Sequence, residues 1–406
     1  MAVVIPPLPH LHPVAGVRLG TACAGIKKPG RRDLVVIELD TGAGCAAVFT
    51  RNAFCAAPVL IARQHLAHAA PRYLLINTGN ANAGTGAQGL RDAEACCAAL
   101  AQLTQCSSDT VLPFSTGVIG EQLPVEKILH GLPEAYARLD AAGWEDAAHG
   151  IMTTDTAAKA VSRTIEIEGC SVTITGIAKG SGMIRPDMAT MLAFIATDAD
   201  VEQSLLQQCL HQAVERSFNR ITVDGDTSTN DACLLIATGK SSLARIDHST
   251  QPAYRMLCDA LIQVCIELAQ LIVRDGEGAT KFITVSVTGG ANQAECDAVA
   301  YAIAHSPLVK TAFFACDPNW GRILAAVGRA GIAGMDIAST TLHLDEVCIV
   351  RNGERAQDYK EEQGQSVMHR NEITISVDLA RGAHCSTVWT CDFSYDYVRI
   401  NAEYRT

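Results

Sequence analysis

Hydrophobic and polar positions follow two different periods along the chain, and they predict helices and strands in turn over most of its 406 residues. Short apolar runs predict buried strands at Tyr73–Asn77, Val111–Phe114 and Thr190–Ala196, because such runs suit strands that are covered on both faces. Apolar residues three or four positions apart predict amphipathic helices at Val201–Phe218 and Pro252–Val273. This alternation is typical of an α/β fold in which helices pack on sheets.

Polar, glycine-rich loops separate these elements. The loop Lys179–Asp187 holds two glycines and a proline, so it cannot be helical. Polar and apolar side chains alternate on both sides of Gly169, which predicts a hairpin. Asp200 and Gln203 form a capping-box pattern that predicts the start of the following helix. The short run Ile221–Asp224 predicts a further strand.

The composition indicates an acidic globular protein with a large core. Hydrophobic residues make up 48% of the chain and charged residues 18%, and the formal net charge is −11. This charge argues against binding to nucleic-acid backbones or anionic membrane surfaces, which require a basic face. The sixteen cysteines include no CxxC pair and no Cys/His cluster with zinc spacing, so we expect no metal ion and no other cofactor.

The length of the chain predicts more than one domain, because a single core rarely serves 406 residues. The character of the sequence changes near residue 280, so we expect domains at 1–280 and 281–406. Several prolines interrupt the N-terminus, which also lacks the basic and apolar segments of a signal peptide. No apolar run approaches the length of a membrane span, and we therefore expect a cytoplasmic protein.

Thr190 is the first candidate for chemistry, although propensity alone makes it an ordinary residue that opens a strand. The glycine-rich loop before it changes this interpretation. A strained turn there would let the Thr190 hydroxyl attack the carbonyl of Ala189. Hydrolysis of the resulting ester would leave Thr190 with a free α-amine, whose ordinary pKa of about 7.7–8.0 suits a general base. One residue would then supply both nucleophile and base.

Further polar residues suit acyl transfer, and each also has a purely structural explanation. Thr116 and Gly117 end a strand, where a hydroxyl and a backbone N–H can bind an oxyanion or simply terminate the strand. Lys179 can hold a substrate carboxylate, depress the pKa of the new amine, or stay solvated in its loop. Glu277 lies between two glycines and either binds an amino group or faces solvent. Thr153 either belongs to a turn or offers its hydroxyl to a ligand.

The segment Gly176–Phe194, which contains the Ala189–Thr190 bond, closely resembles the self-cleavage site of the ornithine acetyltransferase family of arginine biosynthesis, called ArgJ. The resemblance spans nearly the whole chain and is specific, because a dozen residues around one Ala-Thr bond rarely recur by chance. Further blocks match in the same order, namely Ala46–Val59, Asn77–Gly86, Ser115–Gly120, Ile151–Thr156, Val223–Asp231, Asp275–Thr280, Asp317–Arg322 and Asn401–Thr406.

This resemblance implies a ping-pong acetyl transfer through an acetyl group on Thr190. The acetyl group would pass from N2-acetyl-L-ornithine to L-glutamate, giving L-ornithine and N-acetyl-L-glutamate. Some family members also take the acetyl group from acetyl-CoA, and both forms stay open here. Thr116 and Gly117 would form the oxyanion hole. The substrate contacts implied by the resemblance are Thr153, Lys179, Thr190, Glu277, Asn401 and Thr406.

The resemblance also implies a fold and an assembly. The fold would be a layered α-β-β-α sandwich like that of N-terminal nucleophile enzymes, with a smaller C-terminal α/β domain whose last residues return to the active site. Cleavage would give an α chain (1–189) and a β chain (190–406), and two of each would form an α2β2 heterotetramer. The main alternative is a self-cleaving amidase or aminopeptidase, in which water resolves the acyl-enzyme. A non-catalytic binding protein is a third possibility, and it would keep its chain intact.

Overall fold

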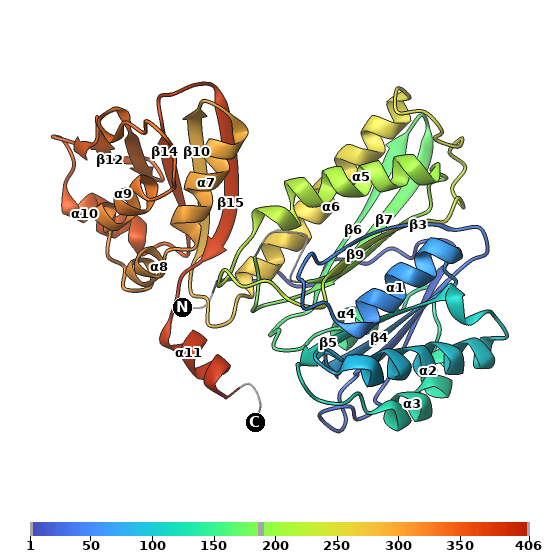
Figure 1. Cartoon of the computed structure of the whole chain (residues 1–406). Coiled ribbons are helices and arrows are strands. Elements are labelled where there is room, and N and C mark those ends of the chain that lie inside the picture. Colours follow the sequence, from blue (N-terminus) through green and yellow to red (C-terminus); the bar gives the residue numbers. More distant parts are fainter. Residues whose placement is uncertain (1–2, 186–190, 404–406) are drawn as a thin grey trace. The chain divides into compact units, whose positions relative to one another are not determined.

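The computed structural model describes residues 3–185 and 191–403 of the chain. The described residues fall into two compact units, coloured along the sequence in Figure 1. The larger unit comprises Pro7–Asn219 and Asp226–Ile272, and the smaller unit comprises Met1–Pro6, Arg220–Gly225 and Val273–Thr406. The last boundary between the two units follows Ile272, a few residues before residue 280, where the sequence predicts a domain boundary.

Two mixed sheets form the centre of the larger unit. The first sheet has the strand order β1-β2-β4-β5, in which β4 and β5 run parallel and the other neighbours antiparallel. The second has the order β3-β9-β8-β7-β6, in which β8 and β9 run parallel and the others antiparallel. The strands are β1 (Val17–Ala22), β2 (Leu34–Leu39), β3 (Gly44–Phe49), β4 (Tyr73–Asn80), β5 (Val111–Val118), β6 (Lys159–Ile167), β7 (Cys170–Lys179), β8 (Leu192–Thr197) and β9 (Ala232–Ala237).

The two sheets pack face to face between layers of helices. Phe114 of β5 and Phe194 of β8 meet edge to face in the shared core, with ring centroids 5.2 Å apart. The side chains on the opposite face of the first sheet pack against α2 and α3. On the second sheet α5 packs on β3, and α6 packs on β7, where Leu268 lies against Gly176. The helices are α1 (Ala57–His68), α2 (Gly86–Thr104), α3 (Val125–Ala137), α4 (Trp144–Gly150), α5 (Gln203–Arg216) and α6 (Pro252–Arg274).

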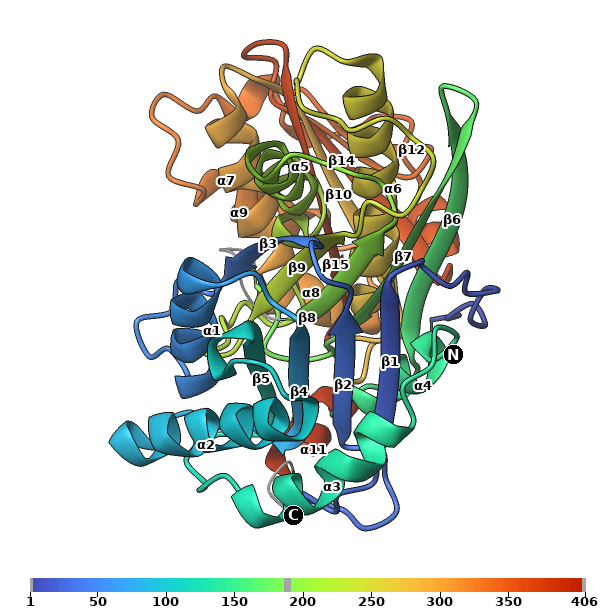
Figure 2. The same cartoon turned by 90° about the vertical axis from the view of Figure 1, so that its right-hand side faces the viewer.

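These layers are visible in two views of the larger unit, with α2 and α3 on one side of the sheets and α5 and α6 on the other (Figures 1 and 2). The order helix, sheet, sheet, helix confirms the predicted α-β-β-α sandwich. The hairpin predicted around Gly169 is also confirmed, because β6 and β7 pair antiparallel on either side of it.

Helix α6 corrects one expectation about membranes. It has 23 residues and, among the described helices, it is the one long and apolar enough to cross a membrane by length and composition. The expectation that no apolar run approaches this length is therefore wrong. Most of its apolar side chains are nevertheless buried, including Leu261, Cys265 and Leu268, as expected for a core helix.

The start of α5 corrects a second expectation. Glu202 is the N-cap, because its carboxylate accepts hydrogen bonds from the backbone N–H groups of Ser204 (2.8 Å) and Leu205 (3.2 Å). The predicted cap, Asp200, lies too early in the chain. Val201 still forms a parallel β-bridge, so the backbone remains extended beyond Asp200 and the helix begins later.

The smaller unit is built on a six-stranded sheet with the order β13-β12-β11-β14-β10-β15, in which β10 and β14 are parallel. Helices α7, α8, α9 and α10 surround its core. The predicted strand Ile221–Asp224 is wrong, because Ile221 makes one isolated bridge to Trp389 and no ladder follows. The elements are β10 (Phe282–Gly290), α7 (Gln293–Ala304), α8 (Pro307–Phe314), α9 (Trp320–Gly328), β11 (Thr341–Leu344), β12 (Val347–Arg351), β13 (Glu354–Arg355), α10 (Glu361–Met368), β14 (Glu372–Asp378), β15 (His384–Cys391) and α11 (Tyr395–Ala402).

Candidate active site

The predicted oxyanion residues lie at the end of β5, where it runs beside β4. Gly117 pairs with Gly79 of the parallel neighbour, and its φ of +139° lies in the region that favours glycine. A Cβ atom on Gly117 would lie 2.3 Å from the carbonyl carbon of Gly79 and 2.5 Å from the nitrogen of Asn80. Glycine is therefore required here by close backbone approach. Thr116 is buried, and its hydroxyl makes no hydrogen bond within the described parts of the chain.

Asn230 joins the end of β5 to the start of β9. Its side-chain amide is buried and donates to the carbonyls of Ala81 (2.6 Å) and Ser115 (2.9 Å). Two residues later, the N–H of Ala232 donates to the carbonyl of Met191 at 3.1 Å. The short segment 230–232 therefore holds both Ser115, which directly precedes Thr116, and Met191, which directly follows residue 190.

Ala189 and Thr190 themselves lie outside the described residues, as does Thr406. Met191 is the first residue that the structure describes after this gap, and β8 follows it. Leu192 pairs with Lys179 on β7 and with Ala232 on β9. Strand β8 therefore begins at the sheet edge where β7 ends and β9 begins.

A hydrogen-bonded cluster at this edge brings Thr153 and Lys179 together. The Lys179 ammonium lies 3.5 Å from the Thr153 hydroxyl, to which it donates. Asp155 accepts from the Thr153 N–H (2.8 Å) through Oδ2 and from the Gly180 N–H (2.7 Å) through Oδ1. Lys159 donates to the same Oδ1 at 2.6 Å. Two loops that are distant in sequence thus share one carboxylate.

The Asp155 carboxylate remains ionised despite its complete burial. Burial by itself would raise the pKa of Asp155. The charges of Lys159 and Lys179, together with the hydrogen bonds from Lys159 and the Thr153 N–H, outweigh that effect and hold the pKa well below its usual range. The side chains of Asp155 and Lys159 are both 0% exposed, and each charge compensates the other directly.

The smaller unit brings Glu277 and Asn401 together. The Asn401 side-chain amide donates to the Glu277 carboxylate at 2.8 Å. Glu277 is buried on a short loop between α6 and β10, and Asn401 lies near the end of α11. The carboxylate of Glu277 has further lone pairs that can accept hydrogen bonds from a ligand amine.

A second buried aspartate fixes the loop that carries Glu277. Asp392 is fully buried, and its Oδ1 accepts from the N–H groups of Thr280 (2.8 Å) and Lys281 (2.9 Å). Its Oδ2 accepts from the Thr280 hydroxyl. Ser394, two residues later, donates to the Gly278 carbonyl at 2.6 Å. The segment before α11 therefore holds the Glu277 loop on both sides of Ala279.

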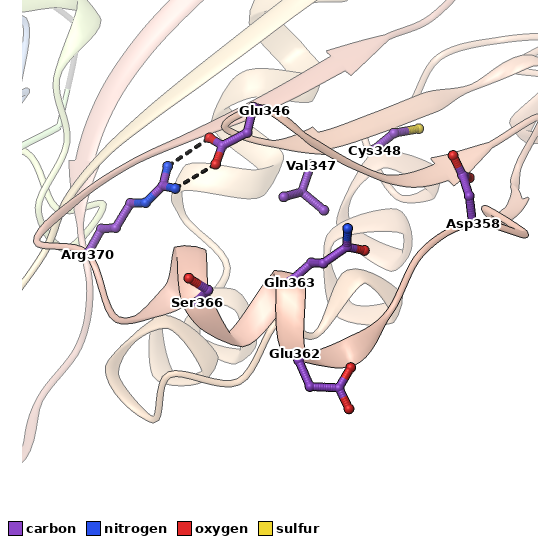
Figure 3. Close-up of a pocket in the computed structure, with 8 residues that line it drawn as sticks. All are labelled: Glu346, Val347, Cys348, Asp358, Glu362, Gln363, Ser366 and Arg370. Atoms are coloured by element: carbon purple, nitrogen blue, oxygen red, sulfur yellow. Dashed lines mark hydrogen bonds and ion pairs between the residues drawn. The ribbon is translucent and has the colours of Figure 1, made fainter.

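An open hollow of about 600 Å³ lies elsewhere in the smaller unit (Figure 3). Its lining side chains include Glu346, Glu362, Gln363 and Arg370, and Arg370 forms paired hydrogen bonds with Glu346. None of the predicted site residues that the structure describes lines this hollow. Within residues 3–185 and 191–403, no group of three or more His, Cys, Asp or Glu side chains is arranged to hold a metal ion.

Sequence reasoning singled out neither Asn230 nor Asp392, and it gave Asp155 no role of its own. Asn230 and Asp155 lie within the family-like blocks Val223–Asp231 and Ile151–Thr156, so the blocks contained a signal for both. Asp392 lies outside every such block. Its role follows from contacts more than a hundred residues away, which local pattern cannot provide.

The layered α-β-β-α sandwich, with buried polar groups at the ends of its central strands, defines a protein of the α/β class. Comparison with protein families is consistent with this class and more specific. The family model described as the ArgJ family matches residues 18–406. The chain therefore belongs to the ArgJ family, which confirms the resemblance and the prediction of an acyltransferase of arginine biosynthesis.

Individual relatives are similar over the whole chain. The arginine biosynthesis bifunctional protein ArgJ of Pseudomonas fluorescens (strain Pf0-1) is 57% identical over 406 residues, which cover 100% of both chains. That of Psychrobacter arcticus is 59% identical over 396 residues, covering 98% of this chain and 97% of the relative. A crystal structure of ArgJ from Bacillus halodurans is 39% identical, covers 50% of this chain and 95% of its own, and gives a TM-score of 0.48. A crystal structure of ornithine acetyltransferase complexed with ornithine from Mycobacterium tuberculosis is 34% identical in sequence. The match covers 43% of this chain and 93% of that chain, with a TM-score of 0.37.

Proposed function

We propose that this protein cuts its own chain between Ala189 and Thr190 and then transfers acetyl groups from N2-acetyl-L-ornithine to L-glutamate through acetyl-Thr190. The products are L-ornithine and N-acetyl-L-glutamate. The proposal rests on family membership and on the arrangement of the strand ends beside Met191.

Self-cleavage begins with attack of the Thr190 hydroxyl on the Ala189 carbonyl. The C–N bond between the two residues breaks as the C–O bond forms, and the hydroxyl proton passes to the new amine. Water then hydrolyses the ester, leaving a carboxylate on Ala189 and a free α-amine and hydroxyl on Thr190. An α-amine has an ordinary pKa of about 7.7–8.0, so the new amine can serve as a general base near neutral pH.

Acetyl transfer then uses Thr190 twice. Its amine takes the hydroxyl proton while the oxygen attacks the acetyl carbonyl of N-acetylornithine. The Gly117 N–H and the Thr116 hydroxyl stabilise the oxyanion, and ornithine leaves with the proton. The glutamate amine attacks acetyl-Thr190 in the second half-reaction, which releases N-acetylglutamate and restores the hydroxyl. No cofactor is needed, because the acetyl group moves between two amines.

Charged residues select amino-acid substrates in this proposal. Lys179 holds the α-carboxylate that both substrates share, and the Thr153 hydroxyl beside it contributes a hydrogen bond. Glu277 and Asn401 contact the substrate's amino groups, and Thr406 contributes a further contact. The proposal includes an α2β2 assembly in the cytoplasm and leaves acetyl-CoA as a second possible acetyl donor.

The observation that carries the proposal is the shared attachment of Ser115 and Met191 to the segment 230–232. It ties the residue before Thr116 to the residue after position 190, as a common oxyanion and nucleophile site requires. The test is to incubate the purified protein with N-acetylornithine, with and without glutamate, and to measure its mass under denaturing conditions. We expect two fragments, 1–189 and 190–406, and glutamate-dependent N-acetylglutamate. Release of free acetate without N-acetylglutamate would instead identify an amidase.

A further inference from the structure

The proposed reaction leaves one buried pair of charges unused, Asp155 and Lys159. Both side chains are 0% exposed, and their Oδ1 and Nζ atoms lie 2.6 Å apart. A buried ion pair is weak evidence for stability, because well-packed apolar side chains of similar volume often stabilise as much or more. Its presence at the end of β7 therefore calls for another explanation than stability.

Asp155 uses both of its oxygens to fix the two loops that carry predicted substrate contacts. Oδ2 accepts from the N–H of Thr153 at 2.8 Å and from its hydroxyl at 3.4 Å. Oδ1 accepts from the N–H of Gly180 at 2.7 Å, and Gly180 directly follows Lys179. Lys159 in turn also donates to the Ala157 carbonyl at 3.2 Å, which fixes the carboxylate within its own loop. Asp155 thus joins the backbone at Thr153 to the backbone that directly follows Lys179. The hydroxyls of Thr154 and Ser181, 2.7 Å apart, connect the same two segments, but Asp155 is the side chain that binds both backbones.

We propose that Asp155 is a positioning residue that sets Thr153 and Lys179 at the spacing needed to bind a substrate α-carboxylate. This inference rests on the proposed function, in which those two residues contact the substrate. Preorganisation of this kind lowers the cost of binding, since neither loop has to be ordered by the ligand. The Lys179 ammonium, 3.5 Å from the Thr153 hydroxyl, is held beside that hydroxyl before any substrate arrives.

The test is a double variant, Asp155→Asn with Lys159→Met. It removes both buried charges together and keeps similar side-chain volumes, so neither charge is left unpaired. An asparagine amide accepts through one oxygen and presents an NH2 group on its other side. It can therefore accept from Gly180 or from Thr153, but it cannot hold both loops as the carboxylate does.

We expect the double variant to raise KM for N-acetylornithine and for glutamate tenfold to a hundredfold, with less than a threefold change in kcat. A second measurement separates positioning from a general structural defect. Ornithine and 1,4-diaminobutane, which lacks the carboxyl group, are compared as inhibitors. The preference for ornithine should fall at least fivefold in the variant, because the carboxylate contact is the one that is lost.

The matched control is Ser162→Ala, which removes a polar contact in the same β6–β7 hairpin. The Ser162 hydroxyl lies 2.8 Å from that of Thr175, away from the Lys179 end of β7. It should leave both KM values within twofold of those of the unaltered protein. If the double variant does not fold, Asp155→Glu keeps the charge beside Lys159 while displacing both loops. That variant should still raise KM at least threefold.

Three results would overturn the inference: a fall in kcat with unchanged KM, equal weakening of ornithine and 1,4-diaminobutane, or the same KM increase in Ser162→Ala. The proposed function fails separately, if the unaltered protein does not transfer acetyl groups from N-acetylornithine to glutamate.

Discussion

Replacement of Gly117 by alanine tests whether the close approach of β5 and β4 builds the predicted oxyanion site. The new Cβ would lie 2.3 Å from the carbonyl carbon of Gly79 and 2.5 Å from the nitrogen of Asn80. Both atoms belong to the backbone, so neither can move aside as a flexible side chain would. Gly120→Ala is the matched control, because Gly120 also has a positive φ (+84°) but has no atom within 4 Å of an added Cβ.

The expected magnitude follows from comparing these two variants. An alanine at positive φ costs roughly 1–2 kcal/mol, and the gain from a stiffer unfolded chain offsets about 0.4–1 kcal/mol of it. The unfolded-chain gain is common to both variants, and the backbone cost is at least as large at Gly117, whose φ of +139° lies further from the left-handed helical region than that of Gly120 (+84°). Gly117→Ala adds overlap in a packed site, which typically costs about 1–3 kcal/mol. We therefore expect Gly117→Ala to lower the free energy of unfolding by about 1–3 kcal/mol more than Gly120→Ala.

The assay is urea unfolding followed by circular dichroism, with both variants made in a Thr190→Ala background so that the chain stays in one piece. The same substitutions in the cleavable protein report on catalysis. Relief of the overlap must push the end of β5 away from β4, so Gly117→Ala should also lose transfer activity, whereas Gly120→Ala should keep most of it. Equal unfolding midpoints for the two variants would refute the steric argument, and full activity of Gly117→Ala would remove the oxyanion role from this strand end.

Three further predictions concern the reaction and its buried charges. Thr190→Ala should block both chain cleavage and acetyl transfer, because nucleophile and amine precursor vanish together; a cut chain on a denaturing gel would place the cleavage elsewhere. Thr116→Ala should keep the fold and lower the transfer rate by about 10²–10³, the usual loss for one oxyanion donor, and an unchanged rate would exclude it from that role. The pKa of Asp155 is depressed below its ordinary 3.8, so its contribution to stability is present above that value and is lost as the pH falls further. The stability difference between the unaltered protein and Asp155→Asn/Lys159→Met should thus be constant from pH 8 to 5 and change only below about pH 4, as measured by urea unfolding across that range.

The sequence predicts most elements of this fold because their signals are local. Apolar periodicity places β4, β5, α6 and the β6–β7 hairpin close to their observed bounds. Local signals fail where two of them compete. Asp200 and Glu202 are both acidic residues ahead of one helix, and the β-bridge at Val201 decides in favour of the later one. Ile221–Asp224 reads as a strand, yet one bridge to Trp389 is all the pairing it forms.

The candidate site is predictable only where family-like blocks mark it. Thr116, Gly117, Thr153, Lys179, Glu277 and Asn401 are found this way, although propensity alone would treat each as an ordinary loop or strand residue. The residues that hold them are harder to find. Asn230 reaches Ser115 across 115 positions of sequence, and Asp392 reaches Thr280 across 112. No periodic pattern encodes such contacts, because they arise from the packing of separate elements.

The two fully buried aspartates answer the same physical problem in separate units. A loop that presents a side chain to a ligand has backbone N–H groups that lack the partners of a helix or strand, and burial makes each unpaired group costly. A carboxylate can accept several such bonds at once, as Asp155 does from Thr153 and Gly180 and as Asp392 does from Thr280 and Lys281. Burial of the carboxylate then requires a nearby cation. Lys159 supplies this cation directly to Asp155. The buried Lys310 lies near Asp392. Burial lowers the pKa of Lys310, and the negative charge of Asp392 partly opposes that shift. In both units a buried carboxylate with a buried lysine nearby thus holds the backbone of a loop that carries predicted substrate contacts.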